Sequence, residues 1–530
     1  AVSPPTAMVP VTRHRCLTVL SLGAVLIACL TTLPVVNGDS EHKRPSVRPT
    51  GKQLEVNGIS PRFANAVTAV RGKLTLKANT YRQQLAAGEG KGLPFDRVVE
   101  CNIGNPQALG QKPVTFVRQV LCLMTYPQLL NNPLVGEIFP SDVIARAKEL
   151  LDNIPGGLGA YSESQGALHV RKACANFIEE RDGYPADPAE IYLTDGASEA
   201  VKMCLQICIR SPDDAILVPI PQYPLYSGSI NLFEGTIAGY YLDEEKGWAL
   251  DVEDLKRSIA ETRAQGKEAR ALVVINPGNP TGNTLSLENQ KEIVKLCADE
   301  HLVLIADEVY QTNLYVQDKP FNSFKKVALD MGYTADDLEI FSTHSVSKGF
   351  MGECGRRGGY VECFGITDEA KGAIYKMIAL GLCSNVAGQV TMELMLNPPK
   401  PGEPSYALYD EERSQLLSSL HRRAQLFCDA FNEMEGVSCN RAEGALYLFP
   451  SITVPSKARE AARAEGIEPD AFYAQQLLDA TGICIVPGSG FRQRDGTSHL
   501  RFAFLPAEED IAAVVGLMKD FHQKFMQEYA

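Results

Sequence analysis

Short apolar runs in the middle of the chain predict buried strands. Four of them occupy residues 191–193, 215–218, 271–275 and 302–306. Their apolar side chains follow one another without polar alternation, which is typical of strands covered on both faces. The pattern predicts a mainly parallel central sheet between two layers of helices.

The segments between these runs have helical spacing. Residues 197–208 carry apolar side chains every three or four positions, and a second helix is expected over residues 287–299 with Ile293, Val294 and Leu296 facing inward. Strands that alternate with helices indicate an α/β domain, in which ligands bind at the carboxyl ends of the strands.

The pattern changes in the last quarter of the chain. Residues 398–402 are rich in turn formers, a polar helix is expected from Asp410 onward, and residues 444–449 resemble a strand. The charged segment 457–465 indicates a solvent-facing helix rather than a binding patch. This zone predicts a smaller α+β domain.

The first fifty residues have a different character. Arg13 and Arg15 precede an uncharged apolar run over residues 16–36, and a polar stretch follows over residues 39–51. A basic region before such a run is typical of a signal peptide or signal anchor. We expect a cleaved targeting leader and linker over residues 1–50, with upstream sequence outside the true start as the alternative. Stable membrane insertion of the mature domain is not expected.

Composition narrows the class of protein. The chain has 530 residues, of which 45% are apolar and 22% charged, as in a soluble enzyme of more than one domain. A net charge of −13 without a long basic block disfavours nucleic acid as a partner. Fourteen cysteines without a C-x-x-C pair disfavour a zinc cluster or a disulfide scaffold, so no metal site is expected.

One lysine lies among small residues in the segment 345–360. Lys348 stands between Ser347 and Gly349, and burying an ammonium group there would be costly. A lysine in such a place can form a Schiff base with an aldehyde cofactor, commonly pyridoxal phosphate, whose phosphate a following arginine could hold. An exposed lysine in a glycine-rich loop is the alternative, and for an isolated motif it would be preferred.

Seven further motifs accompany this segment. In chain order they occupy residues 102–107, 159–166, 195–198, 221–224, 276–282, 307–310 and 487–491. With the lysine segment they resemble the fold-type I aminotransferases, and the run from Gly352 to Tyr360 narrows the resemblance to the alanine aminotransferase group. The resemblance covers the chain from about residue 51 onward. It implies the cofactor pyridoxal 5'-phosphate and an α/β fold with a large domain and a smaller α+β domain.

The resemblance also implies where the parts of the chain belong. Residues 51–125 form an N-terminal arm and part of the small domain, residues 126–395 form the large cofactor-binding domain, and residues 396–530 form the small C-terminal domain. A homodimer with shared active sites is expected, in which Tyr161 reaches the cofactor phosphate of the partner subunit.

A phosphate cup is implied at the turn before residue 199. Gly196, Ala197 and Ser198 end a predicted strand and open a helix, whose free N–H groups favour an anion. Ser198 could instead be a simple helix cap. By resemblance Arg357 and Ser345 complete the cup, with Arg356 as a rival for the arginine.

The cofactor ring is expected beside the strand that ends at Asp307. A carboxylate there needs a partner, and by resemblance this partner is the protonated pyridine nitrogen. Tyr310 and Asn279 are expected to donate to the phenolic oxygen, and Tyr223 to stack on the ring. The alternatives are a capping or arginine-paired carboxylate, a structural turn at Asn279 and core packing for Tyr223.

The substrate is expected at an arginine near the end of the chain. Arg501 lies in an alternating strand pattern, and by resemblance it binds the α-carboxylate, with Asn279 and Gly104 nearby. Arg492 and Arg494 are rivals in a polar loop. Ala503 and Phe504 depart from the family pattern, which bears on fine substrate preference.

The resemblance, carried over to these residues, implies a pyridoxal-phosphate-dependent aminotransferase with amino acids and 2-oxo acids as substrates. The expected reaction converts L-alanine and 2-oxoglutarate into pyruvate and L-glutamate, with Lys348 as the general base. Glutamate:glyoxylate aminotransferase is the first alternative, followed by a lyase of the same fold and a non-catalytic regulator. The leader suggests an organelle or the secretory route, and the resemblance a mitochondrial or cytosolic enzyme.

Overall fold

The computed structural model describes Leu54, residues 59–64 and residues 72–530. The leader and linker expected over residues 1–50 lie outside the described residues. From Ile59 onward the chain forms one unit by its internal contacts, and the account below concerns that unit.

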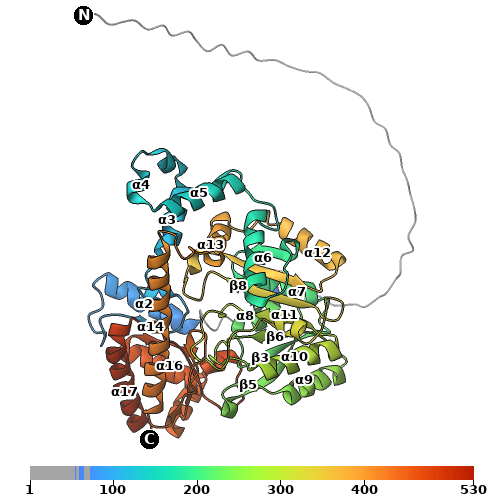
Figure 1. Ribbon diagram of the computed structural model, residues 1–530. Coiled ribbons are helices and arrows are strands. Elements are labelled where there is room, and N and C mark those ends of the chain that lie inside the picture. Colours follow the sequence, from blue (N-terminus) through green and yellow to red (C-terminus); the bar gives the residue numbers. More distant parts are fainter. Residues whose placement is uncertain (1–53, 55–58, 65–71) are drawn as a thin grey trace, which may run out of the picture. The chain divides into compact units, whose positions relative to one another are not determined.

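An eight-stranded sheet forms the centre of the unit (Figure 1). Its strand order is β2-β9-β8-β7-β6-β3-β4-β5. The strands are β2 (Ile191–Thr194), β3 (Asp214–Ile220), β4 (Thr236–Asp243), β5 (Ala249–Leu250), β6 (Glu268–Ile275), β7 (Val303–Asp307), β8 (Ile340–Ser345) and β9 (Gly359–Phe364). The strands from β8 to β4 pair in parallel, whereas β9 is antiparallel to both of its neighbours and β5 is an antiparallel edge. The predicted mainly parallel sheet and its four predicted strands are confirmed.

Alternate residues of the central strands pack into two separate apolar cores, one on each face of the sheet. Val273 and Ile305 pack in a cluster with residues of α7 (Ala197–Cys208), whereas Leu272 and Leu304 pack with residues of α10 (Leu287–Glu300). Because successive strand residues point to opposite faces, the unbroken apolar runs serve a helical layer on each side. Both predicted helices are therefore confirmed, and the Ser286 hydroxyl caps α10 by accepting the Asn289 N–H at 3.1 Å.

Further helices complete the covering of this sheet. They are α8 (Pro224–Leu232), α9 (Val252–Ala264), α11 (Phe324–Asp330) and α12 (Asp368–Ala379). Another group packs into a third apolar cluster beside Val346 and Tyr360: α3 (Thr115–Thr125), α5 (Ser141–Asn153), α6 (Leu168–Asp182) and α13 (Val386–Leu396). Two short helices lie at α1 (Pro61–Ala64) and α4 (Val135–Ile138).

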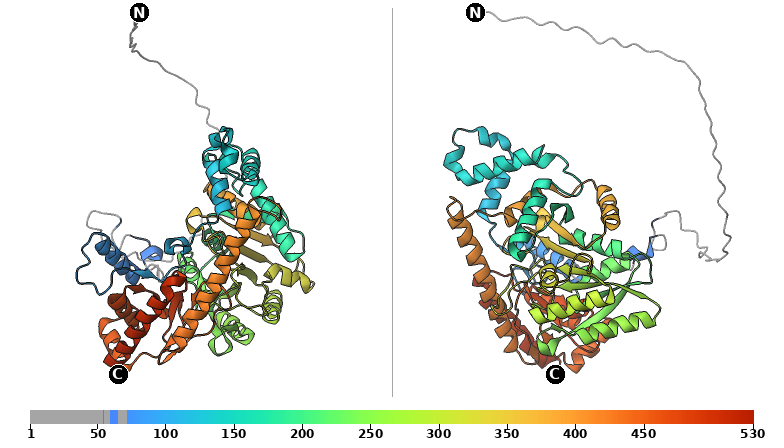
Figure 2. Two further views of the ribbon diagram at one scale, coloured as in Figure 1. Left: turned by 60° about the vertical axis from the view of Figure 1, so that its left-hand side comes forward. Right: turned by 45° about the vertical axis from the view of Figure 1, so that its right-hand side comes forward.

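The C-terminal elements build a separate apolar core. They are α14 (Tyr406–Asn432), β10 (Val437–Ser438), β11 (Tyr447–Leu448), β12 (Ser451–Ile452), α15 (Ser456–Glu465), α16 (Pro469–Thr481), β13 (Ile483–Cys484), β14 (Val486–Pro487), β15 (Leu500–Ala503) and α17 (Ile511–Glu528). The course of the long helix α14 can be followed in orange in Figure 2. It joins two apolar clusters, since Tyr409 packs with α3 and α13 whereas Phe427 packs with β15 and α17.

An early segment packs against these late elements. β1 (Val99–Glu100) pairs in parallel with β13, and Ala78 of α2 (Lys73–Ala86) packs against Leu478 and Cys484. This pairing carries the chain from β1 directly into the loop that contains Gly104. None of the helices in the described ranges is both long and apolar enough to cross a membrane.

The strand expected over residues 444–449 is shorter than its apolar pattern indicates. Only Tyr447 and Leu448 pair as β11, opposite Ala503 and Phe502. Ala445 adopts a left-handed conformation with φ of 57° and donates its N–H to Asn313 O at 3.1 Å. The chain therefore turns before it enters the strand, a tertiary constraint that overrides local propensity.

Candidate active site

A cavity of about 830 Å³ opens where the sheet strands end. Lys348 follows β8, Asp307 ends β7, Asn279 follows β6 and Tyr223 follows β3. Nearly all the predicted site residues line it: Gly104, Ala197, Ser198, Tyr223, Asn279, Asp307, Tyr310, Ser345, Lys348, Arg357 and Arg501. Of the predicted residues, Gly196 lies against the Arg357 guanidinium without lining the cavity itself, and Tyr161 is exposed outside the lining. The carboxyl ends of parallel strands are where this class of fold binds ligands.

Charge in the cavity favours anionic ligands. Lys348, Arg357 and Arg501 are the cationic residues of its lining, and Asp307 is the carboxylate. A site with this excess of positive charge attracts phosphates and carboxylates.

The start of α7 and Arg357 form a cradle at one side of the cavity. Arg357 donates to Asp195 O at 2.8 Å and to Cys354 O at 2.9 Å. Gly196 has φ of 78°, and a Cβ atom there would lie 2.6 Å from Arg357 Nη2, so glycine permits the close approach. Free N–H groups at the helix start and a forked cation beside them suit a phosphate.

Backbone geometry separates the two neighbouring arginines. Arg357 has φ of 56° and turns toward α7, whereas Arg356 lies 3.8 Å from the Glu353 carboxylate and is absent from the cavity lining. The arrangement therefore favours Arg357 over Arg356 for the phosphate.

Asp307 presents a buried carboxylate with one free oxygen. Its Oδ2 accepts a hydrogen bond from the Tyr226 hydroxyl at 2.8 Å, and its Oδ1 has no partner. Burial raises the pKa of Asp307 to about 6, although the Tyr226 hydroxyl and the charge of Lys348 act in the opposite direction. A cationic nitrogen beside Oδ1 would satisfy the free oxygen and keep the carboxylate ionised.

Lys348 reaches across the cavity from the turn after β8. Its Nζ donates to Gly104 O at 2.9 Å, and Gly349, with φ of 66°, donates its N–H to Asn313 Oδ1 at 2.9 Å. Burial lowers the pKa of the Lys348 amine, but nearby Tyr447, Cys354 and Tyr223 outweigh that effect and raise it overall. The Cys354 thiol lies in the same turn and donates to Ser347 O at 3.1 Å.

Arg501 lies on β15, is 1% exposed and also lines the cavity. Its Nη2 donates to Asn102 O at 2.5 Å and its Nη1 to Asn279 Oδ1 at 3.2 Å, while Nε has no partner. The rivals Arg492 and Arg494 are exposed, and Arg494 stacks on Tyr241 at 4.4 Å. The burial and the unpaired Nε make Arg501 the suitable carboxylate ligand.

Aromatic residues surround the space between these groups. Tyr223 borders the cavity and meets Tyr226 edge-on, with ring centroids 6.5 Å apart. The Tyr310 hydroxyl lies 3.4 Å from the Tyr447 hydroxyl. Four residues of this environment were not predicted from the sequence: Asn102, Tyr226, Cys354 and Tyr447. A tyrosine three residues after Tyr223 in a helical segment was the available signal for Tyr226.

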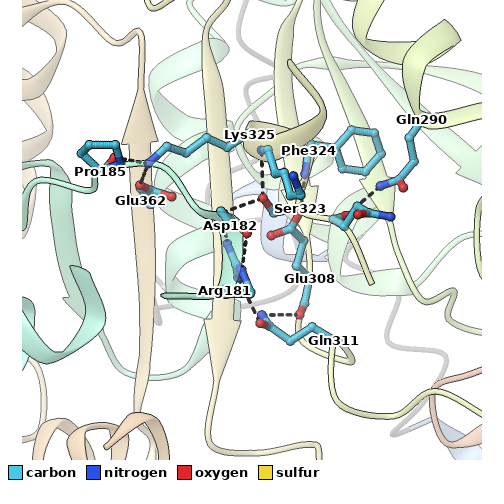
Figure 3. A network of polar contacts seen from close by, with 12 residues as sticks. Arg181, Asp182, Pro185, Gln290, Glu308, Gln311, Ser323, Phe324, Lys325 and Glu362 are labelled. Atoms are coloured by element: carbon cyan, nitrogen blue, oxygen red, sulfur yellow. Dashed lines mark hydrogen bonds and ion pairs between the residues drawn. The ribbon is translucent and has the colours of Figure 1, made fainter. Parts of the chain in front are cut away.

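A buried polar network supports the turn that carries Asp307 and Tyr310 (Figure 3). Arg181 binds Asp182 through two 2.7 Å contacts and donates to Gln311 Oε1 at 3.0 Å. Gln311 in turn donates to Glu308 O at 3.1 Å, and Glu308 Oε1 accepts the Phe324 N–H at 2.9 Å. The network ties the end of β7 to α6 and α11.

Glu308 should make stability depend on pH. Burial raises its pKa to about 8, although Arg181 acts in the opposite direction. Between the two pKa values, the Glu308 carboxyl therefore keeps its proton in the folded state, whereas in the unfolded state, where its pKa is lower, it has lost it. Stability is therefore fully present below about pH 4.3 and is lost as the pH rises toward 8, by at most about 1.4 kcal/mol per pH unit.

Glu308→Gln removes this titration and keeps an acceptor for the Phe324 N–H. Urea unfolding between pH 5.5 and 7.5 should show the parent losing stability relative to the variant as the pH rises. A difference that stays constant over this range would contradict a protonated Glu308.

Comparisons with known proteins agree with this geometry. The aminotransferase class I and II family model matches residues 130–516. The probable mitochondrial alanine aminotransferase of Dictyostelium discoideum is 52% identical over 482 residues, covering 90% of each chain. Glutamate–glyoxylate aminotransferase 2 of Arabidopsis thaliana is 50% identical over 480 residues, covering 90% of this chain and 98% of its own.

The fold has solved counterparts as well. The alanine aminotransferase structure from Pyrococcus furiosus superposes with a TM-score of 0.69 at 23% identity, covering 88% of this chain and 100% of that one. The family match over most of the chain and the identity to full-length relatives lead to one conclusion: the chain belongs to the class I and II aminotransferases, in their alanine aminotransferase group.

Proposed function

We propose that the protein transfers an amino group between L-alanine and 2-oxoglutarate, giving pyruvate and L-glutamate, with pyridoxal 5'-phosphate as cofactor. This proposal rests on one observation: four functional groups with different chemical roles line the same cavity. A lysine amine, a buried carboxylate with a free oxygen, an anion cradle and a buried arginine with an unpaired nitrogen all face it.

The cavity residues fit this cofactor. The α7 start and Arg357 suit its phosphate, and the unpartnered Asp307 Oδ1 suits a protonated ring nitrogen. When bound, the cofactor supplies an aldehyde that carries the amino group and a ring that accepts the electron pair of the substrate Cα–H bond. Tyr310 and Asn279 would donate to its phenolic oxygen, and Tyr223 would lie against the ring.

The remaining chemistry belongs to the protein. Lys348 would anchor the cofactor covalently and, once released by the incoming amino acid, move a proton from the substrate Cα. Asp307 would keep the ring nitrogen protonated, because the negative carboxylate and the positive nitrogen stabilise each other's charged form. Arg501 would hold the α-carboxylate that amino donor and keto acceptor share.

A substrate panel tests the function. Purified protein supplied with pyridoxal phosphate should convert alanine and 2-oxoglutarate into pyruvate and glutamate, measured by mass spectrometry. Lys348→Ala protein provides the control for adventitious activity. If the parent protein, supplied with pyridoxal phosphate, forms neither pyruvate nor glutamate, the proposal is contradicted.

Glutamate:glyoxylate aminotransferase is the second candidate. The relative of that name from Arabidopsis is 50% identical, and the discrimination of small keto acids depends on modest differences in pocket shape. Preference for glyoxylate over pyruvate and 2-oxoglutarate, compared by kcat/KM in the same panel, would favour it.

Several relatives are named mitochondrial, which supports delivery to that organelle. Imaging of a fluorescent C-terminal fusion tests this.

We further infer a homodimer with shared sites. Tyr161 is 76% exposed and lies outside the cavity of its own chain, as expected for a residue that serves the partner subunit's site. Mixing Tyr161→Phe chains with Lys348→Ala chains should restore activity, because one hybrid site combines both parental residues. No recovery despite demonstrated subunit exchange, with each variant alone impaired, would contradict shared sites.

A further inference from the structure

Tyr447 lies between the two groups to which the proposed reaction assigns carboxylate binding and proton transfer. Its strand β11 pairs with β15 so that Tyr447 faces Ala503, two residues from Arg501 on the same strand. The Arg501 guanidinium lies over the Tyr447 ring, 4.4 Å from its centroid, and 5.1 Å from the Phe491 centroid. The flat cation therefore has an aromatic face as its support.

The hydroxyl of Tyr447 and the amine of Lys348 both lie beside Gly104. A Cβ atom built on Gly104 would collide with the Tyr447 hydroxyl and would lie 2.9 Å from Lys348 Nζ. The two polar ends therefore crowd the same side of Gly104, and only glycine leaves room for both. The same hydroxyl accepts a hydrogen bond from Tyr310 at 3.4 Å.

The backbone before Tyr447 is anchored outside its own strand. Ala445 donates its N–H to Asn313 O at 3.1 Å and accepts the Tyr315 hydroxyl at 2.7 Å on its carbonyl. Asn313 also holds the Gly349 N–H through its side chain at 2.9 Å. One residue thus fixes both the turn before Tyr447 and the turn after Lys348, which makes their relative placement definite.

Several ionisable groups surround this pair. Burial opposes ionisation of Tyr447, but the charges of Lys348 and Arg501 and the contact with Tyr310 hold its pKa below the usual value. Tyr447 in turn acts with Cys354 and Tyr223 to raise the pKa of Lys348, while Arg501 lowers it. Asp307 is the carboxylate of the same cavity.

We propose that Tyr447 is a positioning residue of the reaction: its ring face holds the guanidinium of Arg501, and its hydroxyl holds the Lys348 amine. This inference rests on the proposed transamination. It divides into a hydroxyl role and a ring role, and each has its own variant.

Tyr447→Phe tests the hydroxyl role, because the ring face remains. The kcat for alanine should fall by at least about tenfold, as for loss of a hydrogen bond to a charged group, while KM changes little. The acid limb of the kcat profile should move to lower pH, because a group that raises the pKa of the Lys348 amine is gone. An unchanged kcat and an unchanged limb would overturn this role.

Tyr447→Met tests the ring role with a side chain that fills space without an aromatic face. Propionate, a carboxylate without an amino group, should bind the cofactor-loaded variant at least about fivefold more weakly than the parent in calorimetry. Tyr447→Phe should bind propionate as the parent does. Parental affinity in Tyr447→Met would overturn the ring role.

Tyr240→Phe is the matched control. Tyr240 is 1% exposed and donates to Val273 O at 2.7 Å in the sheet, away from the cavity lining. It should lower Tm through the lost hydrogen bond and leave kcat, the pH limb and propionate binding unchanged. Propionate binding requires no turnover, so the ring role remains testable even if the parent protein fails to transaminate alanine. The hydroxyl role can be tested with Tyr447→Phe even if Tyr447→Met fails to fold.

Discussion

Lys348→Ala should lower the turnover of alanine and 2-oxoglutarate by at least about a thousandfold, because the group that moves the Cα proton is removed. The variant should still retain pyridoxal phosphate, since the cradle of α7 and Arg357 is untouched. Borohydride reduction and peptide mapping should leave the mass of the cofactor on Lys348 in the parent and nowhere in the variant.

A matched lysine separates this effect from loss of a charge. Lys202 lies on α7, is ion-paired with Glu199 and is not part of the cavity lining. Lys202→Ala should keep parental turnover and the label on Lys348. Near-parental turnover in Lys348→Ala would refute the assignment of the base.

Arg501→Ala should reduce kcat/KM for every substrate by about 30-fold to 5,000-fold, which corresponds to the roughly 2–5 kcal/mol lost when one partner of a buried charge pair is removed. The loss should be similar for alanine, glutamate, pyruvate and 2-oxoglutarate, since all four carry the α-carboxylate. Arg501→Lys keeps the charge but loses the planar fork, so it should also be impaired.

The exposed neighbour Arg494 provides the comparison. It stacks on Tyr241 outside the cavity, and Arg494→Ala should leave kcat/KM near the parental value for all four substrates. A loss in Arg501→Ala that is confined to the two dicarboxylic substrates would place Arg501 at the distal carboxylate instead.

The choice between two adjacent arginines illustrates where a local pattern stops being sufficient. Arg356 and Arg357 are adjacent in the sequence, and although the resemblance favours Arg357, residue type and polarity do not separate them. The left-handed backbone at Arg357 does, because it turns that side chain toward Asp195 O while Arg356 stays near Glu353. Such a choice depends on packing around the turn rather than on the residue type.

The sequence by itself determined the parts of this protein that depend on neighbouring residues. Unbroken apolar runs predicted the parallel strands, helical spacing predicted α7 and α10, and the strand ends marked Asp307 and the turn of Lys348. These features follow from local burial, periodicity and chain reversal, which a few consecutive residues encode.

Only the tertiary structure decided which distant groups meet. Tyr226 donates to Asp307, and the Asn102 carbonyl accepts from Arg501. Tyr447 enters the cavity from a strand that follows a turn, and Ala445 in this turn donates its N–H to Asn313 O. Tyr226 and Asp307 are 81 residues apart in the sequence, and Asn102 and Arg501 are 399 residues apart. The physical reason is that an apolar or strand-like pattern records that a side chain is buried, whereas its partner is set by how whole elements pack together.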